Sequence, residues 1–292
     1  MNKLIFFLVS VIILFIFRKN TALCNNISSH NENVIQLYEK TNKFWFMINE
    51  KNQLWKNLGY MKKNNYSTYS KAGENLAFYL GKKAGLNNNS IILDVGCGYG
   101  TQDKFFNDKF KVKKIDAISI TPIDIYFANK LYKKNNITFI CQDACNLNNF
   151  LKNHYTHVIS LESAFHFNTR ELFLKQAYNV LQKDGKIALA DIIFNDTCET
   201  SELWQVPIQN IYSKNNYYKI LKNIGFNDIK FECINDDIFI KNVSWNYVIS
   251  TCLSKYKYID FEMLDTFYKV FKVRYTKAKN IDDGYYIITA KK

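Results

Sequence analysis

The chain has 292 residues, and its 48% of hydrophobic and 16% of aromatic residues are typical of a globular protein rather than a disordered one. Its net charge of +13 comes from lysines spread along the chain, with only Arg18, Arg170 and Arg274 beside them, so we expect no nucleic-acid partner. The seven cysteines include no CxxC pair, so we expect no metal site.

The chain begins with an apolar segment, Leu4–Phe17, which is followed by the basic pair Arg18-Lys19. This run is shorter than the ~20 residues of a membrane-spanning helix but matches the apolar region of a signal peptide. Ala22 and Cys24 are small residues at the positions that a signal peptidase reads, whereas the basic pair fits an uncleaved anchor better. A buried amphipathic helix is the alternative. We therefore predict a signal peptide or signal anchor over 1–24, entry into the secretory pathway or an endomembrane organelle, and a polar linker over 25–33.

Candidate helices and strands alternate from residue 34 onward. The strand candidate Ile91–Val95 is apolar almost throughout, which is typical of a strand buried on both faces of a parallel sheet. We predict helices over 34–58, 73–84, 102–110, 122–134, 146–153, 169–181, 216–224 and 243–271, and strands over 91–95, 113–120, 137–141, 157–161, 185–193, 228–234 and 284–289.

This alternation predicts an α/β fold: a Rossmann-like, doubly wound, mostly parallel seven-stranded sheet with helices on both faces. One domain would span 34–292. Its core would cover 73–234, with an N-terminal helical lid over 34–72 and a C-terminal helical insertion over 235–283.

A glycine-rich loop follows the first strand, with the sequence Asp94-Val95-Gly96-Cys97-Gly98-Tyr99-Gly100. Glycines let a backbone turn tightly and approach a ligand closely. The acidic residue at the end of the strand would repel a pyrophosphate but can hold a cationic amino group. The loop therefore favours a cationic nucleotide-like ligand over a dinucleotide.

This loop resembles the first motif of the class I S-adenosylmethionine-dependent methyltransferases of small-molecule type, similar to the tocopherol, sugar O-methyl and cyclopropane-synthase-like enzymes. The resemblance implies S-adenosyl-L-methionine as the cofactor. It also implies that Asp94 helps to hold the methionine amino end, and that the residues after it pack against the cofactor, namely Gly96, Cys97, Gly98 and Gly100.

The end of the second predicted strand is where this family often carries an acid for the ribose hydroxyls. Ser119 stands at the usual acid position here, followed by Thr121, and Asp124 replaces the glutamine of the subgroup. The resemblance implies that these residues serve the ribose. For Asp124 the alternative is a first-turn carboxylate that stabilises a helix N-terminus.

Gln142-Asp143-Ala144 resembles the third motif of the family, whose aspartate accepts a hydrogen bond from the adenine amino group. The resemblance places all three residues at the cofactor. The alternative for Asp143 is a loop aspartate in an Asx turn.

Residues 157–167 resemble the fourth motif, although His157 replaces its usual aspartate. Ligands of such sheets lie beyond the carboxyl ends of the strands, so Glu162 and His166 should border the methyl donor. The resemblance implies catalytic roles, with His166 as a general base or an aligning residue, because the pKa of an imidazole is near working pH. The alternative is a hydrogen-bonded structural histidine.

The segment 64–70 lies where the subgroup places a cofactor-covering lid, so Tyr66 and Tyr69 are further candidates for cofactor contact. Surface tyrosines of a loop are the alternative. Segments 194–218 and 234–271 are rich in aromatic residues, which favours an apolar or amphiphilic acceptor such as a lipid, quinol, sterol or glycosylated metabolite. The alternative is that these aromatic residues belong to the core.

The predicted function is therefore methyl transfer from S-adenosylmethionine to a small acceptor. An RNA or protein methyltransferase and a non-catalytic cofactor-binding scaffold remain as alternatives. The basic surface and the segment 4–17 are compatible with a membrane surface or a membrane anchor. The oligomeric state is left open.

Overall fold

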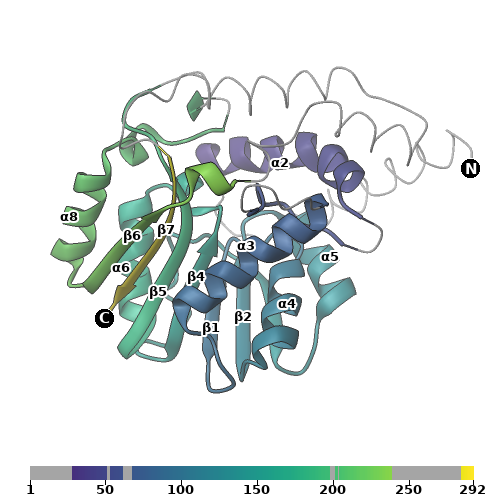
Figure 1. The fold of residues 1–292 in the computed structure, drawn as a ribbon, viewed down its shortest axis with the longest axis horizontal. Coiled ribbons are helices and arrows are strands. Elements are labelled where there is room, and N and C mark those ends of the chain that lie inside the picture. The colour runs from purple at the N-terminus through teal and green to yellow at the C-terminus, as the bar shows by residue number, and fades with distance from the viewer. Residues whose placement is uncertain (1–27, 51–52, 62–67, 198–200, 203, 239–283) are drawn as a thin grey trace, which may run out of the picture.

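The computed structural model describes residues 28–50, 53–61, 68–197, 201–202, 204–238 and 284–292. Its seven strands form one sheet, and helices cover both faces of it (Figure 1). The strands are β1 (Ile91–Val95), β2 (Lys114–Ser119), β3 (Ile137–Cys141), β4 (Tyr155–Leu161), β5 (Leu181–Ile193), β6 (Asn227–Cys233) and β7 (Gly284–Lys291). The helices are α2 (Ser29–Ile48), α3 (Tyr69–Ala84), α4 (Thr101–Phe110), α5 (Pro122–Tyr132), α6 (Arg170–Val180) and α8 (Lys214–Ile224), with short 3-10 turns η2 (Ala164–His166), η3 (Ile208–Asn210) and η4 (Asn235–Asp237).

The strand order is β3-β2-β1-β4-β5-β7-β6. Strands β1 to β5 pair in parallel, whereas β7 runs antiparallel to both β5 and β6. The order reverses direction at β1 and β4, so the carboxyl ends of these two strands form the crevice where such sheets bind ligands. This arrangement confirms the predicted Rossmann-like, mostly parallel seven-stranded sheet.

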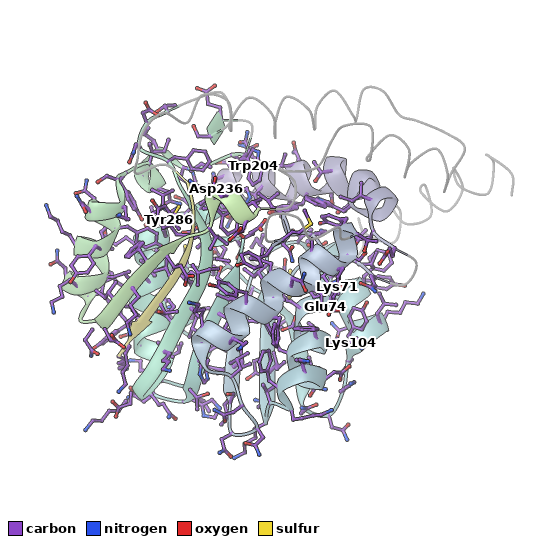
Figure 2. All side chains as sticks on the ribbon, in the orientation of Figure 1. Lys71, Glu74, Lys104, Trp204, Asp236 and Tyr286 are labelled. Atoms are coloured by element: carbon purple, nitrogen blue, oxygen red, sulfur yellow. The ribbon has the colours of Figure 1, made fainter. Side chains whose placement is uncertain are left out.

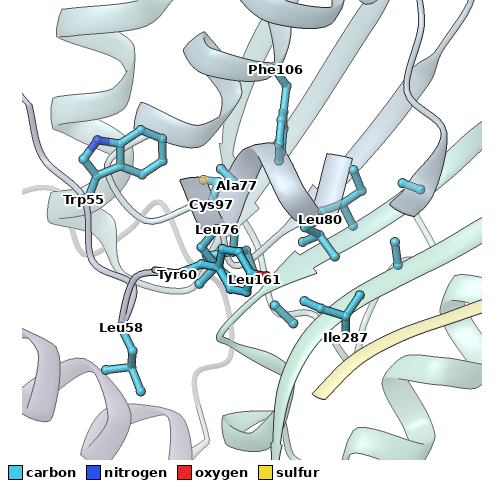
Figure 3. Packing of buried hydrophobic residues seen from close by; sticks show 14 of the residues in the cluster. Trp55, Leu58, Tyr60, Leu76, Ala77, Leu80, Cys97, Phe106, Leu161 and Ile287 are labelled. Carbon is cyan, nitrogen blue, oxygen red and sulfur yellow. The ribbon is translucent and has the colours of Figure 1, made fainter. Parts of the chain in front are cut away.

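Two hydrophobic clusters lie on opposite faces of the sheet because successive side chains of a strand point to opposite sides. In β5, Ala188 and Ala190 belong to one cluster, whereas Ile187 and Leu189 belong to the other. Leu80 of α3 lies in the first cluster (Figure 3). Helices α3, α4 and α5 cover this first face, and α6 and α8 cover the second, as expected for a doubly wound sheet.

Helix α2 forms the predicted N-terminal lid, but its bounds differ from the prediction of a linker over 25–33 and one or two helices over 34–58. The helix begins at Ser29, inside the predicted linker, because the Ser28 side chain accepts a hydrogen bond from the backbone N–H of Asn31. It ends at Ile48 because the Asn49 side chain bonds to both Trp45 and Trp55 and turns the chain back.

The predicted helix over 146–153 was wrong, because this segment forms turns. Asp143 accepts a hydrogen bond from the backbone N–H of Cys145, and the Gln142 side chain donates to the carbonyl of Asn146. Four asparagines in the segment offer the backbone further local partners, which compete with a helix. The other predicted elements are present within a few residues of their expected bounds, except for the helical insertion over 243–271, which lies outside the described residues.

Charged side chains lie on the outer faces of the helices. Lys71 and Glu74 of α3 form an exposed ion pair, and Lys104 of α4 pairs with Asp108 (Figure 2). Exposed pairs of this kind contribute little to stability. Among the described residues, no helix is long and apolar enough to cross a membrane; the segment 4–17 is not among them.

Candidate active site

A cavity lies at the carboxyl ends of β1, β2 and β4, and residues of α2 line it from above. Four segments of the sheet contribute to its wall, together with the loop 54–57. The cavity collects most of the site residues predicted from the sequence: Gly96, Cys97, Gly98, Ser119, Thr121, Asp124, Gln142, Asp143, Ala144, Glu162 and His166.

The glycine loop needs glycine because of the side chains packed against it. Gly96 has a φ of +87°, and a Cβ there would lie 2.1 Å from the Ser163 hydroxyl oxygen. Gly100 has a φ of +77°, and a Cβ there would lie 2.7 Å from the Phe139 ring. Gly96 lines the cavity, whereas Gly100 does not and caps the start of α4, so the cofactor contact at Gly100 stays a prediction.

Asp94 also lies outside the cavity wall, beneath the glycine loop. Its Oδ2 accepts a hydrogen bond of 2.6 Å from the Gln102 side chain, and Gln102 does line the cavity. Asp103 lies next to Asp94 and is buried, and this burial together with the neighbouring charge raises the pKa of Asp103 well above its usual range. Gln102 therefore links Asp94 to the cavity, and direct contact of Asp94 with the cofactor stays a prediction.

Asp124 occupies the first turn of α5 and is almost fully buried. Its Oδ1 lies 2.7 Å from the ammonium nitrogen of Lys56, which comes from the loop after α2. Ser119 and Thr121 lie beside it, and the Ser119 hydroxyl accepts a hydrogen bond from the Thr121 backbone N–H. The structure therefore brings the three predicted ribose residues together and adds a lysine to them.

Asp143 lies at the predicted adenine end of the cavity. Its Oδ2 accepts a hydrogen bond of 2.9 Å from the Asn31 side chain, and its Oδ1 accepts one from the Cys145 backbone. The second bond is the Asx turn that was the alternative interpretation, so the aspartate serves the turn and faces the cavity as well. Asn31 belongs to α2, which ties the lid to this end of the site.

Glu162 lies where β4 ends and has a φ of +57°, an uncommon conformation for a residue other than glycine. Its Oε1 accepts hydrogen bonds from the Leu58 backbone N–H and from the Tyr285 hydroxyl. Glu162 thus joins three segments at the cavity wall: the end of β4, the loop after α2, and β7. Strained backbone of this kind is typical of functional sites.

His166 is buried in the η2 turn, and its Nε2 lies 3.1 Å from the Tyr38 hydroxyl of α2. The side chain of His30, also in α2, bonds to the His166 carbonyl oxygen at 2.8 Å. Burial, and secondarily the charge of His30, lowers the pKa of His166 to about 3. Burial likewise raises the pKa of Tyr38. Both groups are therefore neutral near pH 7, so the phenol can donate its hydrogen bond to the imidazole.

Of the two predicted lid tyrosines, Tyr69 does not line the cavity. Tyr69 is buried in the core, where its hydroxyl donates to the carbonyls of Trp55 and Asn57. It therefore supports the loop that carries Lys56 instead of contacting the cofactor directly. Tyr66 lies outside the described residues.

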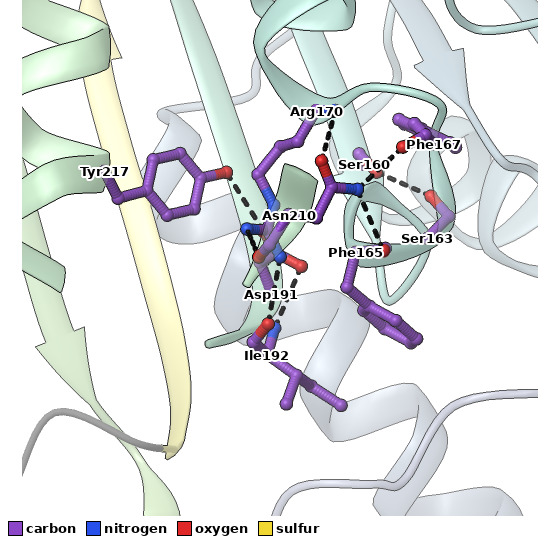
Figure 4. A network of polar contacts seen from close by, with 9 residues as sticks. All are labelled: Ser160, Ser163, Phe165, Phe167, Arg170, Asp191, Ile192, Asn210 and Tyr217. Atoms are coloured by element: carbon purple, nitrogen blue, oxygen red, sulfur yellow. Dashed lines mark hydrogen bonds and ion pairs between the residues drawn. The ribbon is translucent and has the colours of Figure 1, made fainter. Parts of the chain in front are cut away.

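A buried polar network supports the η2 turn from behind (Figure 4). The Asn210 side chain donates to the carbonyls of Phe165 and Phe167, on either side of His166. Arg170 in turn donates to the Asn210 carbonyl and forms an ion pair with Asp191 at 3.0 Å. The backbone position of His166 is thus set by residues from α6, β5 and η3.

Comparison with known proteins places this site in a family. Residues 93–189 match the model of a methyltransferase domain. The erythromycin 3''-O-methyltransferase of Saccharopolyspora erythraea is 30% identical over 200 residues, which cover 62% of this chain and 65% of that enzyme. The phosphoethanolamine N-methyltransferase of Plasmodium falciparum is 27% identical over 207 residues, 68% of this chain and 72% of that enzyme. The chain thus spans slightly less than two thirds of the erythromycin enzyme's length.

A solved structure shares the fold of this chain. Phosphoethanolamine N-methyltransferase 2 of Haemonchus contortus, solved with phosphomonomethylethanolamine and S-adenosylhomocysteine, superposes with a TM-score of 0.69 at 17% identity. The superposition covers 91% of this chain and 60% of that one. Residues 93–189 of this chain form a methyltransferase domain. The comparisons support the S-adenosylmethionine-dependent family predicted from the sequence.

The residues of this methyltransferase domain suit the cofactor of the family. The cavity offers hydrogen-bond acceptors at its ribose and adenine ends, Asp124 and Asp143, and glycine backbone between them. Beneath the glycine loop, Oδ1 of Asp94 has no hydrogen-bond partner among the described residues. No cluster of three or more metal-binding side chains was found in the described part of the chain.

Four residues of the methyltransferase site were missed in the sequence: His30, Asn31, Tyr38 and Lys56. All four come from α2 or the loop that follows it. Their spacing in the chain follows no family motif. The sequence therefore predicted only that a lid covers the cofactor, not which lid residues contact the site. Their roles depend on where the lid packs.

Proposed function

We propose that this protein transfers the methyl group of S-adenosylmethionine to a small, apolar or amphiphilic acceptor. The observation that carries the proposal is the hydrogen-bonded pair of Tyr38 and His166 at the wall of the cofactor cavity, with 3.1 Å between the hydroxyl and Nε2. The match to a methyltransferase domain supports S-adenosylmethionine as the methyl donor. Small acceptors are supported by the relatives, whose names specify erythromycin and phosphoethanolamine.

When bound, S-adenosylmethionine supplies a methyl group that its positive sulfonium activates for in-line displacement. The chain then has to align the acceptor, exclude water and take up the proton that the acceptor loses. Neutral His166 offers Nε2 as a hydrogen-bond acceptor, either directly or through the Tyr38 hydroxyl, and so aligns the acceptor group. Its low pKa makes it a weak base, so it would take up the proton only once methyl transfer has made the acceptor group acidic.

The surroundings of His166 support an acceptor with apolar surface. The Trp204 ring lies parallel to the imidazole, with 6.3 Å between the ring centroids, and the Phe165 ring lies 4.2 Å from it. Val34 and Phe167 add apolar wall to the cavity. A lipid, quinol, sterol or glycosylated metabolite would meet Val34 and Phe167 in the cavity, whereas Phe165 and Trp204 contact the His166 ring without lining the cavity. We include a membrane-bound acceptor because of the apolar segment 4–17.

The test is methyl transfer by the full chain from methyl-labelled S-adenosylmethionine to a panel of amphiphilic alcohols, quinols, sterols and phosphorylated amines. Tyr38→Phe and His166→Gln are each expected to lower kcat by about 10²-fold or more, because they remove the hydrogen-bonded pair that aligns the acceptor. Tyr218→Phe, which removes an exposed hydroxyl on α8, should leave kcat unchanged.

Transfer to RNA or protein but to no small molecule would overturn this proposal in favour of the first alternative. Binding of S-adenosylmethionine without transfer to any acceptor class would favour the scaffold.

A further inference from the structure

Lys56 is the one lysine or arginine among the cavity-lining residues that the structure describes. Three carboxylates, those of Asp124, Asp143 and Glu162, line the same cavity. An anionic ligand group that enters this cavity therefore has a single side-chain cation available to it. The methionine moiety of S-adenosylmethionine carries such an anionic group, its α-carboxylate, and burying a carboxylate without a partner is costly.

The position of Lys56 is built by the fold. The backbone of its loop is fixed on both sides, because Tyr69 donates to the carbonyl of Trp55 and the Leu58 N–H donates to Glu162. The Lys56 side chain is only 10% exposed, and its partner Asp124 only 4%.

The Lys56 ammonium lies between the glycine loop and Asp124, two parts of the cavity wall. Its nitrogen lies 3.9 Å from the centroid of the Tyr99 ring, on the glycine loop, and 2.7 Å from Asp124 at the ribose position. The stem of the lysine passes close to Gly98, where a Cβ would lie 3.7 Å from Lys56 Cδ. A lysine of this length can therefore face either the glycine loop or Asp124.

A buried ion pair is weak evidence for stability, because desolvation of the two charges offsets much of their attraction. Burial here lowers the pKa of Lys56 and raises that of Asp124, so the site works against both charges. An ammonium has three hydrogen-bond donors. Asp124 is the only hydrogen-bond acceptor that the described residues offer to Lys56, which leaves capacity for a second anionic partner.

We propose that Lys56 binds the α-carboxylate of the cofactor's methionine moiety. Asp124 is then released from the ion pair, or shares the ammonium, and accepts the ribose hydroxyls that its place after β2 predicts. When the cofactor binds, the contact between Lys56 and Asp124 is thus replaced or shared: Lys56 contacts the carboxylate, and Asp124 contacts the ribose. This inference rests on the function proposed above, because it assigns a residue to the cofactor of that reaction.

The test compares two ligands by isothermal titration of the full chain. S-Adenosylhomocysteine carries the amino-acid carboxylate, whereas 5'-methylthioadenosine has the same nucleoside and sulfur but no amino-acid group. Lys56→Met, which keeps the apolar stem, is expected to weaken S-adenosylhomocysteine binding by about 10- to 100-fold, the loss of one charged hydrogen bond. It should change methylthioadenosine binding by less than about 3-fold, and Lys56→Arg should restore most of the affinity.

Lys71→Met, which removes an exposed lysine of α3, is the matched control and should bind both ligands as the wild type does. If Lys56→Met leaves a buried unpaired carboxylate and does not fold, Lys56→Met combined with Asp124→Asn allows the same comparison of ligands relative to Asp124→Asn alone. Equal weakening of both ligands, or no change in either, would overturn the carboxylate assignment while leaving the proposed function intact. A wild-type chain that is folded but binds neither ligand would overturn both.

Discussion

His166 shows how one buried side chain is set by its neighbours. Its ring lies against Tyr38, Phe165 and Trp204, so the charged form of the imidazole is poorly solvated. The pKa of His166 is lowered to about 3 for this reason, compared with ~6.5 for an exposed histidine. An imidazole that stays neutral throughout the physiological range can accept a hydrogen bond and align the acceptor, but this low pKa makes it a weak base.

The lowered pKa predicts how folding stability depends on pH. Between about pH 3 and pH 6.5 the unfolded chain protonates this histidine and the folded chain does not, so its contribution is present above pH 6.5 and is lost as the pH falls. We expect the wild type to lose about 2 kcal/mol more free energy of unfolding than His166→Gln between pH 7 and pH 4.5. Urea unfolding at both pH values measures this difference. Equal losses in the two proteins would show that the imidazole is not buried in its neutral form.

At the scale of secondary-structure elements, the η2 turn also depends on its neighbours for its position. It is only three residues long and cannot hold His166 by its own hydrogen bonds. The ion pair of Arg170 and Asp191 joins α6 to β5, and Asn210 extends it to the turn (Figure 4). The Tyr217 hydroxyl of α8 also donates to Asp191, so side chains of α6, β5, η3 and α8 together fix one side of the active site.

Breaking this network should destabilise the whole domain. Arg170→Met leaves Asp191 buried without its cation, and we expect a loss of about 3–5 kcal/mol in the free energy of unfolding. Asp191→Leu should cost a similar amount, but the double variant should cost clearly less than the sum, because no unpaired charge remains. Urea denaturation of the three variants forms the double-mutant cycle. Additive losses would mean that the two side chains do not depend on each other.

At the scale of the whole molecule, the sheet and the lid contribute different parts of the site. The sheet presents the glycine loop and the ends of β2, β3 and β4 at one edge, and α2 closes that edge with contacts to Asp143 and His166 (Figure 1). The apolar segment 4–17 precedes this lid in the chain. If it holds the chain at a membrane, the lid would be the part of the domain that follows the anchor, which suits an amphiphilic acceptor.

The leader prediction can be tested apart from the enzyme. A fusion of residues 1–33 to a fluorescent reporter in a eukaryotic cell is expected to fractionate with membranes. Aspartates in place of Leu8 and Ile12 should release it, because each charge opposes insertion by roughly 2.5–3.5 kcal/mol. Persistence of the fusion in the membrane pellet after alkaline extraction would identify an anchor, and a shortened luminal product would identify a cleaved signal. A wild-type fusion that remains soluble in the cytosol would contradict targeting.

The sequence alone determined the sheet and the part of the site that belongs to it. Hydrophobic periodicity and the loop from Asp94 to Gly100 are local patterns, and in a parallel sheet the carboxyl ends of neighbouring strands must meet. Ser119, Asp143 and His166 could therefore be assigned to one site before any coordinates. The turns at 146–153 were missed because local hydrogen bonds of Asp143 and Gln142 outcompete a short helix there.

The tertiary structure decided which side chains complete that site. Tyr38 and His166 are 128 positions apart, and Lys56 and Asp124 are 68 apart, so neither pairing follows from a local pattern. Each depends on how α2 and its following loop pack over the sheet. The same packing buried Tyr69 and removed it from the cofactor wall. Contacts between distant segments are fixed by the packing of whole elements, which a single sequence does not specify residue by residue.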